Sequence, residues 1–110
     1  GETSLALATG KQGGGLMRVV IGTLTITTAG TELQFSNTAD RVKSLSVRAR
    51  PGNTGNVFLG TSTVTSSLGW TLQPGESKTL DFGGGSVLFS VFYLDTATSG
   101  NDVDYSAILE

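Results

Sequence analysis

Apolar and polar residues alternate with a period of two along much of this chain. Leu24 and Ile26 alternate with threonines, and farther along Leu45 and Val47 alternate with serine and arginine. This alternation is typical of strands that bury one face, and no segment shows the 3.6-residue period of an amphipathic helix. The pattern therefore predicts an all-β protein.

Turn signals rich in glycine separate these runs. Proline-glycine pairs stand at residues 51–52 and 74–75, and three consecutive glycines at residues 83–85. About eight short strands divided by such turns predict an antiparallel β-sandwich or a jelly-roll-like small barrel. Gly22, inside the first strand, indicates a bulge. The alternation places these side chains in the core: Leu24, Ile26, Leu33, Phe35, Leu45, Val47, Phe58, Leu72, Phe82, Phe89 and Val91.

The run Val87–Leu94 (VLFSVFYL) differs from the other strands because it is apolar on both faces. Such a strand is usually buried on both sides, so we expect it in the centre of a sheet or under another element. Its apolar area exceeds what one thin sandwich needs to cover, which favours contact between subunits.

The chain divides into two parts, residues 1–16 and residues 17–110. The second part is predicted to be a single β-sandwich domain, since the whole chain of 110 residues has the size of one domain. The first part is predicted to be an extended, flexible N-terminal arm, with residues 10–15 (GKQGGG) as its hinge. Leu5 and Leu7 on this arm are candidate contacts with a neighbouring subunit. A frayed terminus is the alternative.

The composition excludes several kinds of chemistry. Cys and His are both absent, which rules out disulfides, thiolate zinc sites, a cysteine nucleophile and the usual general base. We therefore expect neither an enzyme nor a cofactor. The net charge of -2 argues against a nucleic-acid partner. No apolar run approaches the roughly 20 residues that span a membrane, so no membrane partner is expected.

Two acids, Asp102 and Asp104, stand two positions apart and so share one face of a strand, near Asn101. Calcium needs about six to eight converging oxygens, and the spacing of an EF-hand loop is absent. A solvated hairpin end is the preferred interpretation. A pair of glycosidase acids is the alternative, since such acids can come from distant strands.

Four of the seven basic residues gather on one predicted strand with no acid among them: Arg41, Lys43, Arg48 and Arg50. A basic patch fits an acidic protein surface or a phosphate backbone, and protection of a sheet edge by charge explains it equally well. Arg48 and Arg50 are the candidate contact residues, because the alternation turns them away from the core.

Trp70 follows a loop rich in serine and threonine, residues 61–67. If it is exposed, the indole would stack on a sugar or anchor a subunit contact. Packing of Trp70 in the core under that loop is the preferred interpretation.

The stretch Val42–Glu76, VKSLSVRARPGNTGNVFLGTSTVTSSLGWTLQPGE, combines several features in a fixed order. A strand leads into Pro-Gly and Asn-x-Gly turns, a short Val-Phe-Leu-Gly strand follows, and a Ser/Thr-rich loop precedes a Leu-Gln-Pro-Gly-Glu turn. This pattern resembles small virion structural proteins of tailed bacteriophages, in particular head-decoration (cement) and head-fibre proteins. The similarity covers residues 27–110.

The resemblance implies a β-sandwich protomer that decorates and stabilises the exterior of a phage capsid through contacts between subunits. The implied partners are the major capsid protein and further copies of the chain, with a homotrimer favoured, and the arm would grip the shell or a neighbour. The protein would be made in the cytoplasm of a bacterial host and reside on the capsid surface of the virion. No individual residue role carries over, because the shared positions belong to strands and turns.

The alternative function is a carbohydrate-binding or adhesin module of a phage tail or head appendage. Trp70, Tyr93 and Tyr105 would then be platforms on which sugar rings stack. The number of copies in a virion separates the two functions, since decoration needs many copies and an appendage few.

Overall fold

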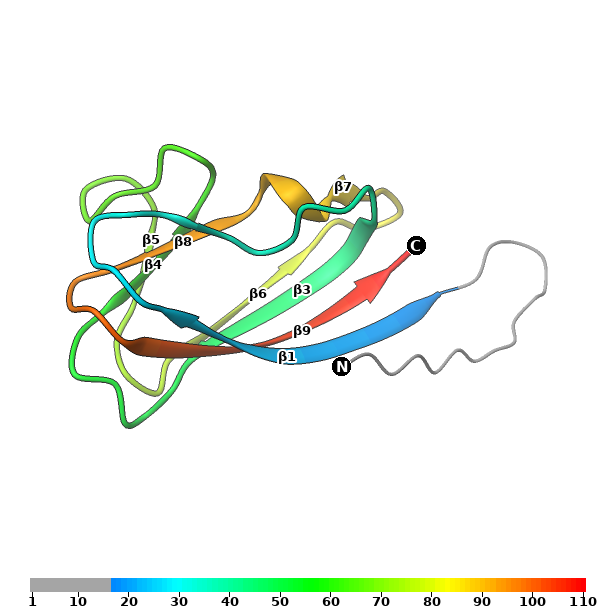
Figure 1. Cartoon of the computed structure of the whole chain (residues 1–110). Helices are drawn as coiled ribbons and strands as arrows, with labels where there is room; N and C mark the ends of the chain where they lie inside the picture. Colours follow the sequence, from blue (N-terminus) through cyan, green and yellow to red (C-terminus); the bar gives the residue numbers. More distant parts are fainter. Residues whose placement is uncertain (1–16) are drawn as a thin grey trace.

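The computed structural model describes residues 17–110, which form two antiparallel sheets (Figure 1). The larger sheet has the strand order β1 (Arg18–Ile26), β9 (Asn101–Leu109), β3 (Arg41–Ala49) and β6 (Ser77–Asp81), and β7 (Val87–Leu88) pairs with the start of β3. The smaller sheet has the order β2 (Leu33–Gln34), β8 (Tyr93–Thr96), β4 (Val57–Gly60) and β5 (Trp70–Leu72). The predicted antiparallel sandwich is confirmed, with nine strands in the described residues rather than about eight.

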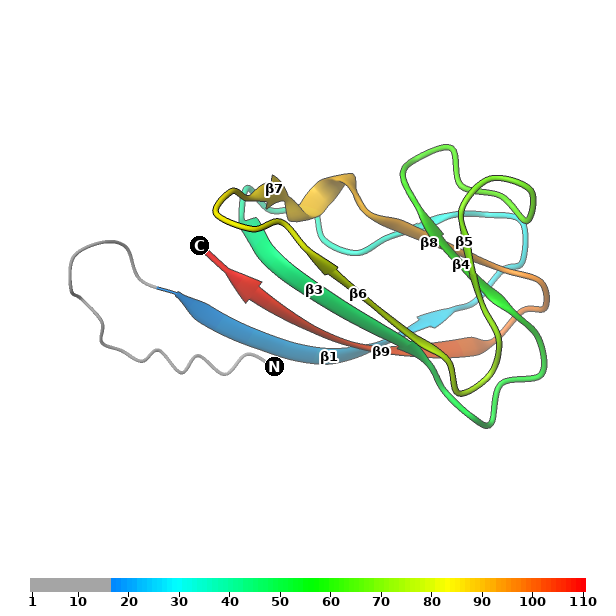
Figure 2. The same ribbon diagram turned by 180° about the vertical axis from the view of Figure 1, so that it is seen from behind.

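The two sheets differ in strand length and cover each other only in part. The strands β1, β9, β3 and β6 run side by side, and the short strands of the smaller sheet lie across one end of them (Figure 1 and Figure 2). The other end lies under β7 and a 3-10 turn, Phe89–Val91. The face of the larger sheet turned away from the smaller sheet is not covered by any other element of residues 17–110.

Alternation decides which side chains enter the space between the sheets. On β9, Val103, Ala107 and Leu109 are buried, while Asp104 and Ile108 point to the opposite face. The same rule holds on β3 apart from a bulge, which lies between Val42 and Ser44 instead of at Gly22. Fully buried side chains come from both sheets: Ile26, Val42, Leu45, Val47, Val57, Leu94, Val103 and Leu109.

Gly22 does not form a bulge; its missing side chain leaves room for the ring of Tyr105. A Cβ at this position would lie 2.8 Å from the Oη atom of Tyr105 and 2.9 Å from a ring carbon. The Tyr105 ring needs that space because it packs edge-on against Phe35, with ring centroids 5.3 Å apart, and also against Phe89. The glycine therefore lets the central aromatic cluster approach the backbone of β1.

The prediction of one apolar strand over Val87–Leu94 is wrong. The segment contains β7, the 3-10 turn and the start of β8, because the chain passes here from the larger to the smaller sheet. A three-residue period puts Phe89 and Phe92 on one side, where both are buried, and turns Val91 outward. Val91 is 36% exposed and is the only residue of the predicted core that lies on the surface. Much of the apolar area thus stays inside one chain.

Candidate functional site

The uncovered face of the larger sheet, called here the outer face, is ordered in rows by cross-strand pairing. Residues directly opposite one another on neighbouring strands have adjacent side chains, so a register defines a row across the sheet. The first row begins with two apolar residues and consists of Val19, Ile108, Ser44 and Asp81. The second, the hydroxyl row, consists of Ile21, Ser106, Ser46 and Thr79. The third, the ion row, consists of Thr23, Asp104, Arg48 and Ser77.

Asp104 is the centre of the ion row. Its carboxylate accepts hydrogen bonds from Arg48 Nη2 at 2.8 Å, from Arg50 Nε at 2.9 Å and from Thr23 Oγ1 at 2.8 Å. These donors favour the charged form, and the bond from Arg48 contributes most to lowering the pKa of Asp104. Arg48 and Arg50 point away from the core, as predicted, but they share one carboxylate.

Basic residues of β3 thus have acids beside them in the fold, and protection of a sheet edge is the wrong explanation for their charge, because β3 lies between β9 and β6. Arg41 donates from Nε to Ser86 Oγ at 2.9 Å and lies 3.9 Å from a carboxylate oxygen of Glu110. The acids come from β9 and the C-terminal end, which pair with β3 although they lie more than fifty positions away in the sequence. The face that carries Arg48 and Arg50 is close to neutral.

The neighbouring acids do not converge on one point. Asp102 accepts a hydrogen bond from Thr25 Oγ1 at 2.6 Å on the outer face. Asp95 is buried and accepts from the backbone N–H of Gly30 and of Thr96. Asp102 and Asp104 share a face, as predicted, but both have partners within the sheet and do not form a solvated hairpin end. Within residues 17–110, no group of three acids could hold a metal ion.

Two asparagines fix the loops beside this face. Asn53 donates from Nδ2 to the Asp102 carbonyl at 2.9 Å and accepts from the Asp102 N–H at 2.8 Å. Asn101 is 2% exposed, accepts from the Thr54 N–H at 2.9 Å and donates to Thr96 Oγ1 at 2.8 Å. Sequence reasoning missed both roles, because the loop they join to β9 is nearly fifty positions away along the chain.

Trp70 lies at the start of β5 and is 51% exposed, so the indole is not packed in the core under the preceding loop. The Nζ atom of Lys78 lies 3.9 Å from the centre of its ring. Lys78 pairs with Val47 on the inner face of β6, and β5 and β6 are edge strands of the two sheets. This cation–π contact therefore connects the edge strands of the two sheets on the open side of the sandwich.

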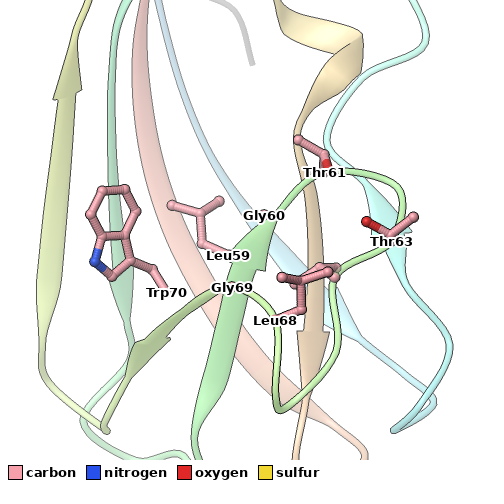
Figure 3. Close-up of a pocket in the computed structure, with 8 residues that line it drawn as sticks. Leu59, Gly60, Thr61, Thr63, Leu68, Gly69 and Trp70 are labelled. Carbon is pink, nitrogen blue, oxygen red and sulfur yellow. The ribbon is translucent and has the colours of Figure 1, made fainter.

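A pocket of about 490 Å³ adjoins Trp70 (Figure 3). Gly60 and Gly69 lie in its middle, with the indole on one side and Leu68 and two threonines on the other. Val64 is buried against the two glycines, and a Cβ on Gly69 would come within 2.8 Å of it. The lining residues are Leu59, Gly60, Thr61, Thr63, Val64, Leu68, Gly69 and Trp70.

The other predicted contact residues are distributed as follows. Tyr105 packs inside the sandwich among Phe35 and Phe89, so it is not an exposed stacking platform. Tyr93 lies on β8 opposite Gly60 and is half-buried, outside the Trp70 pocket. Leu5 and Leu7 lie outside the described residues. The structure therefore separates Arg48 and Arg50, on the outer face, from Trp70, on the open side of the sandwich.

A search against models of protein families finds no match, and a search of curated proteins finds none either. Among residues 17–110, no helix is long and apolar enough to cross a membrane.

Proposed function

We propose that this chain is a non-catalytic structural protein of a phage virion, which assembles as a homo-oligomer, preferably a trimer, on the outside of the capsid. Its partners are further copies of the chain and the major capsid protein. Three kinds of observation support the proposal: the motif order of residues 42–76, the β-sandwich, and the character of the outer face.

The observation that carries the proposal is the apolar end of the outer face. Ile21 is 64% exposed and Ile108 is 38% exposed on adjacent strands. Val19 lies directly opposite Ile108, and Met17, also exposed, precedes β1. Clustered exposed apolar side chains of this kind mark contact surfaces, and burying them between symmetric copies removes them from water.

The rest of the outer face suits close approach by another protein. Apart from Ile21, the hydroxyl row has short side chains, with Ser46 and Thr79 joined by a hydrogen bond of 3.0 Å. In the ion row, Arg48 and Asp104 already have each other as partners, and Arg50, beside the row, donates to the same carboxylate. A partner that covers the ion row therefore meets charges that are already paired, whereas burying an unpaired charge is the costly event at an interface.

Quantitative mass spectrometry of purified virions tests the proposal. We expect copies of the chain in a fixed, high ratio to the major capsid protein, and purified chain should bind shells from which it has been stripped. Absence from the virion, or only a few copies in each particle together with no binding to stripped shells, would contradict the proposal.

A further inference from the structure

The Trp70 pocket has a different character from the outer face. None of the residues that line it is ionisable, so it offers no charge to an ion or a charged group. Its volume of about 490 Å³ is that of a small-molecule site, for which about 300–1,000 Å³ is typical. The ligand that fits is small and uncharged.

The pocket also presents polar groups without partners. Within residues 17–110, neither the hydroxyl of Thr61 nor that of Thr63 takes part in a hydrogen bond. Both residues are exposed and stand on the loop that faces the indole across Gly60 and Gly69 (Figure 3). The ligand should therefore combine an apolar face with hydroxyl groups.

A cation–π contact with Lys78 restrains the indole of Trp70. The Nζ atom of Lys78 lies 3.9 Å from the ring centre and so covers one face of the indole, while Trp70 as a whole remains 51% exposed. The two glycines add no side chain between the ring and the threonines, and Gly69 has a φ of +150°, which a larger residue would adopt only under strain.

We propose that this pocket is a binding site for a neutral oligosaccharide. One sugar ring would stack its C–H face on the indole of Trp70, and hydroxyls of the next ring would hydrogen-bond to Thr61 and Thr63. Leu68, which is 57% exposed, would gain an apolar partner. The site does not depend on the proposed capsid function, because it lies on the open side of the sandwich and not on the outer face.

Trp70 is the only tryptophan of the chain, so its fluorescence reports on this site alone. We expect a saturable change in emission on titration with at least one of cellotetraose, chitotetraose and lactose, with a dissociation constant on the order of 1 mM for so shallow a site. Backbone amide shifts measured by NMR should move at residues 59–70 and stay unchanged on the outer face. No change with any of the three sugars at ten times that concentration would overturn the proposal.

Variants separate a binding site from a structural tryptophan. Trp70→Ala should weaken binding about tenfold or more, while Trp70→Phe keeps part of it. Thr61→Val and Thr63→Val each remove one hydroxyl at nearly constant volume and should weaken binding about two- to tenfold. Ile21→Ala, on the outer face, is the matched control and should bind as the unmodified chain does. Shifts that persist in Trp70→Ala would overturn the proposal.

A protein partner is the competing occupant of the pocket. If copies of the chain cover Trp70, its emission will shift to the blue as the protein concentration rises, without any sugar, and sugar will not quench it. That result would overturn the saccharide site. An emission maximum independent of protein concentration, together with the sugar response, would support it.

Discussion

The larger and the smaller sheet differ in whether their polar side chains find hydrogen-bond partners within the fold. In the larger sheet, β1, β3 and β9 are nine residues long, and beyond the bulge of β3 they pair continuously, so Asp104, Thr23 and Arg48 meet across three strands. In the smaller sheet the strands have two to four residues, and a loop carries the polar groups instead. Within residues 17–110, the hydroxyls of Thr61 and Thr63 on that loop have no hydrogen-bond partner. Long paired strands therefore give a neutral face that suits a protein, and short strands leave a pocket that suits a small ligand.

The core between the sheets should be far more sensitive to truncation than the loop that forms the pocket. Leu45 is fully buried in the main core, so Leu45→Ala should lower the free energy of unfolding by about 2–5 kcal/mol. Val64 is buried apart from that core, and Val64→Ala should cost about 1 kcal/mol. Urea unfolding followed by circular dichroism measures both. Equal losses would mean that the loop belongs to the main folding unit.

The side chain of Asn101, at the start of β9, holds the loop that precedes β4 through the Thr54 N–H. Its removal should cause the next largest loss of stability. Asn101→Ala leaves the Thr54 N–H without its acceptor, which should lower the free energy of unfolding by about 1–3 kcal/mol. Asn37→Ala, in an exposed loop, is the control and should change it by less than about 0.5 kcal/mol. Similar values for the two variants would show that the buried amide has no special part in stability.

Substitution of Gly22 tests whether β1 needs a glycine where the Tyr105 ring approaches its backbone. Gly22→Ala should lower the free energy of unfolding by about 1–3 kcal/mol, because the added methyl group meets the Tyr105 ring. Gly52→Ala adds the same group where nothing lies within 4 Å and should be close to neutral. Chemical denaturation of the two variants gives the comparison, and a neutral Gly22→Ala would show that the ring moves freely.

The ion row predicts a small dependence of stability on pH. The pKa of Asp104 is lowered below its ordinary value of 3.8, so its contribution is complete above that pH and is lost as the pH falls through the lowered pKa. The exposed pairs make this contribution less than about 1 kcal/mol. Asp104→Asn should therefore lose less stability than the unmodified chain on acidification below that value. Parallel acid titrations followed by circular dichroism would show the difference, and identical curves would contradict it.

The alternation of apolar and polar residues was enough to predict the sandwich and most of its core. It works for β1, β3 and β9 because each buries one face only. It failed at Val91, where a 3-10 turn replaces the period of two with a period of three. A crossing between sheets has no signature in a list of apolar residues, so the run Val87–Leu94 had the composition of a central strand without being one.

The candidate sites were harder to predict, for a different reason. The sequence placed Arg48 and Arg50 on the surface but favoured a Trp70 packed in the core, whereas all three are about half exposed. It missed the partner Asp104 because charge counted along one strand ignores the strand that pairs with it. It missed Lys78 because β5 and β6 are edge strands of different sheets that meet only in the fold. Ile21 was not singled out, since a single isoleucine among threonines has the pattern of an ordinary strand until the register is known.

Light scattering after size exclusion tests most directly whether the outer face joins copies of the chain. We predict a mass that is a multiple of 11.3 kDa. The double variant Ile21→Lys and Ile108→Lys should be a folded monomer by circular dichroism, whereas Leu68→Lys, at the Trp70 pocket, should keep the oligomer. A strict monomer of 11.3 kDa at every concentration of the unmodified chain, or an oligomer that survives the double variant, would contradict this role of the outer face.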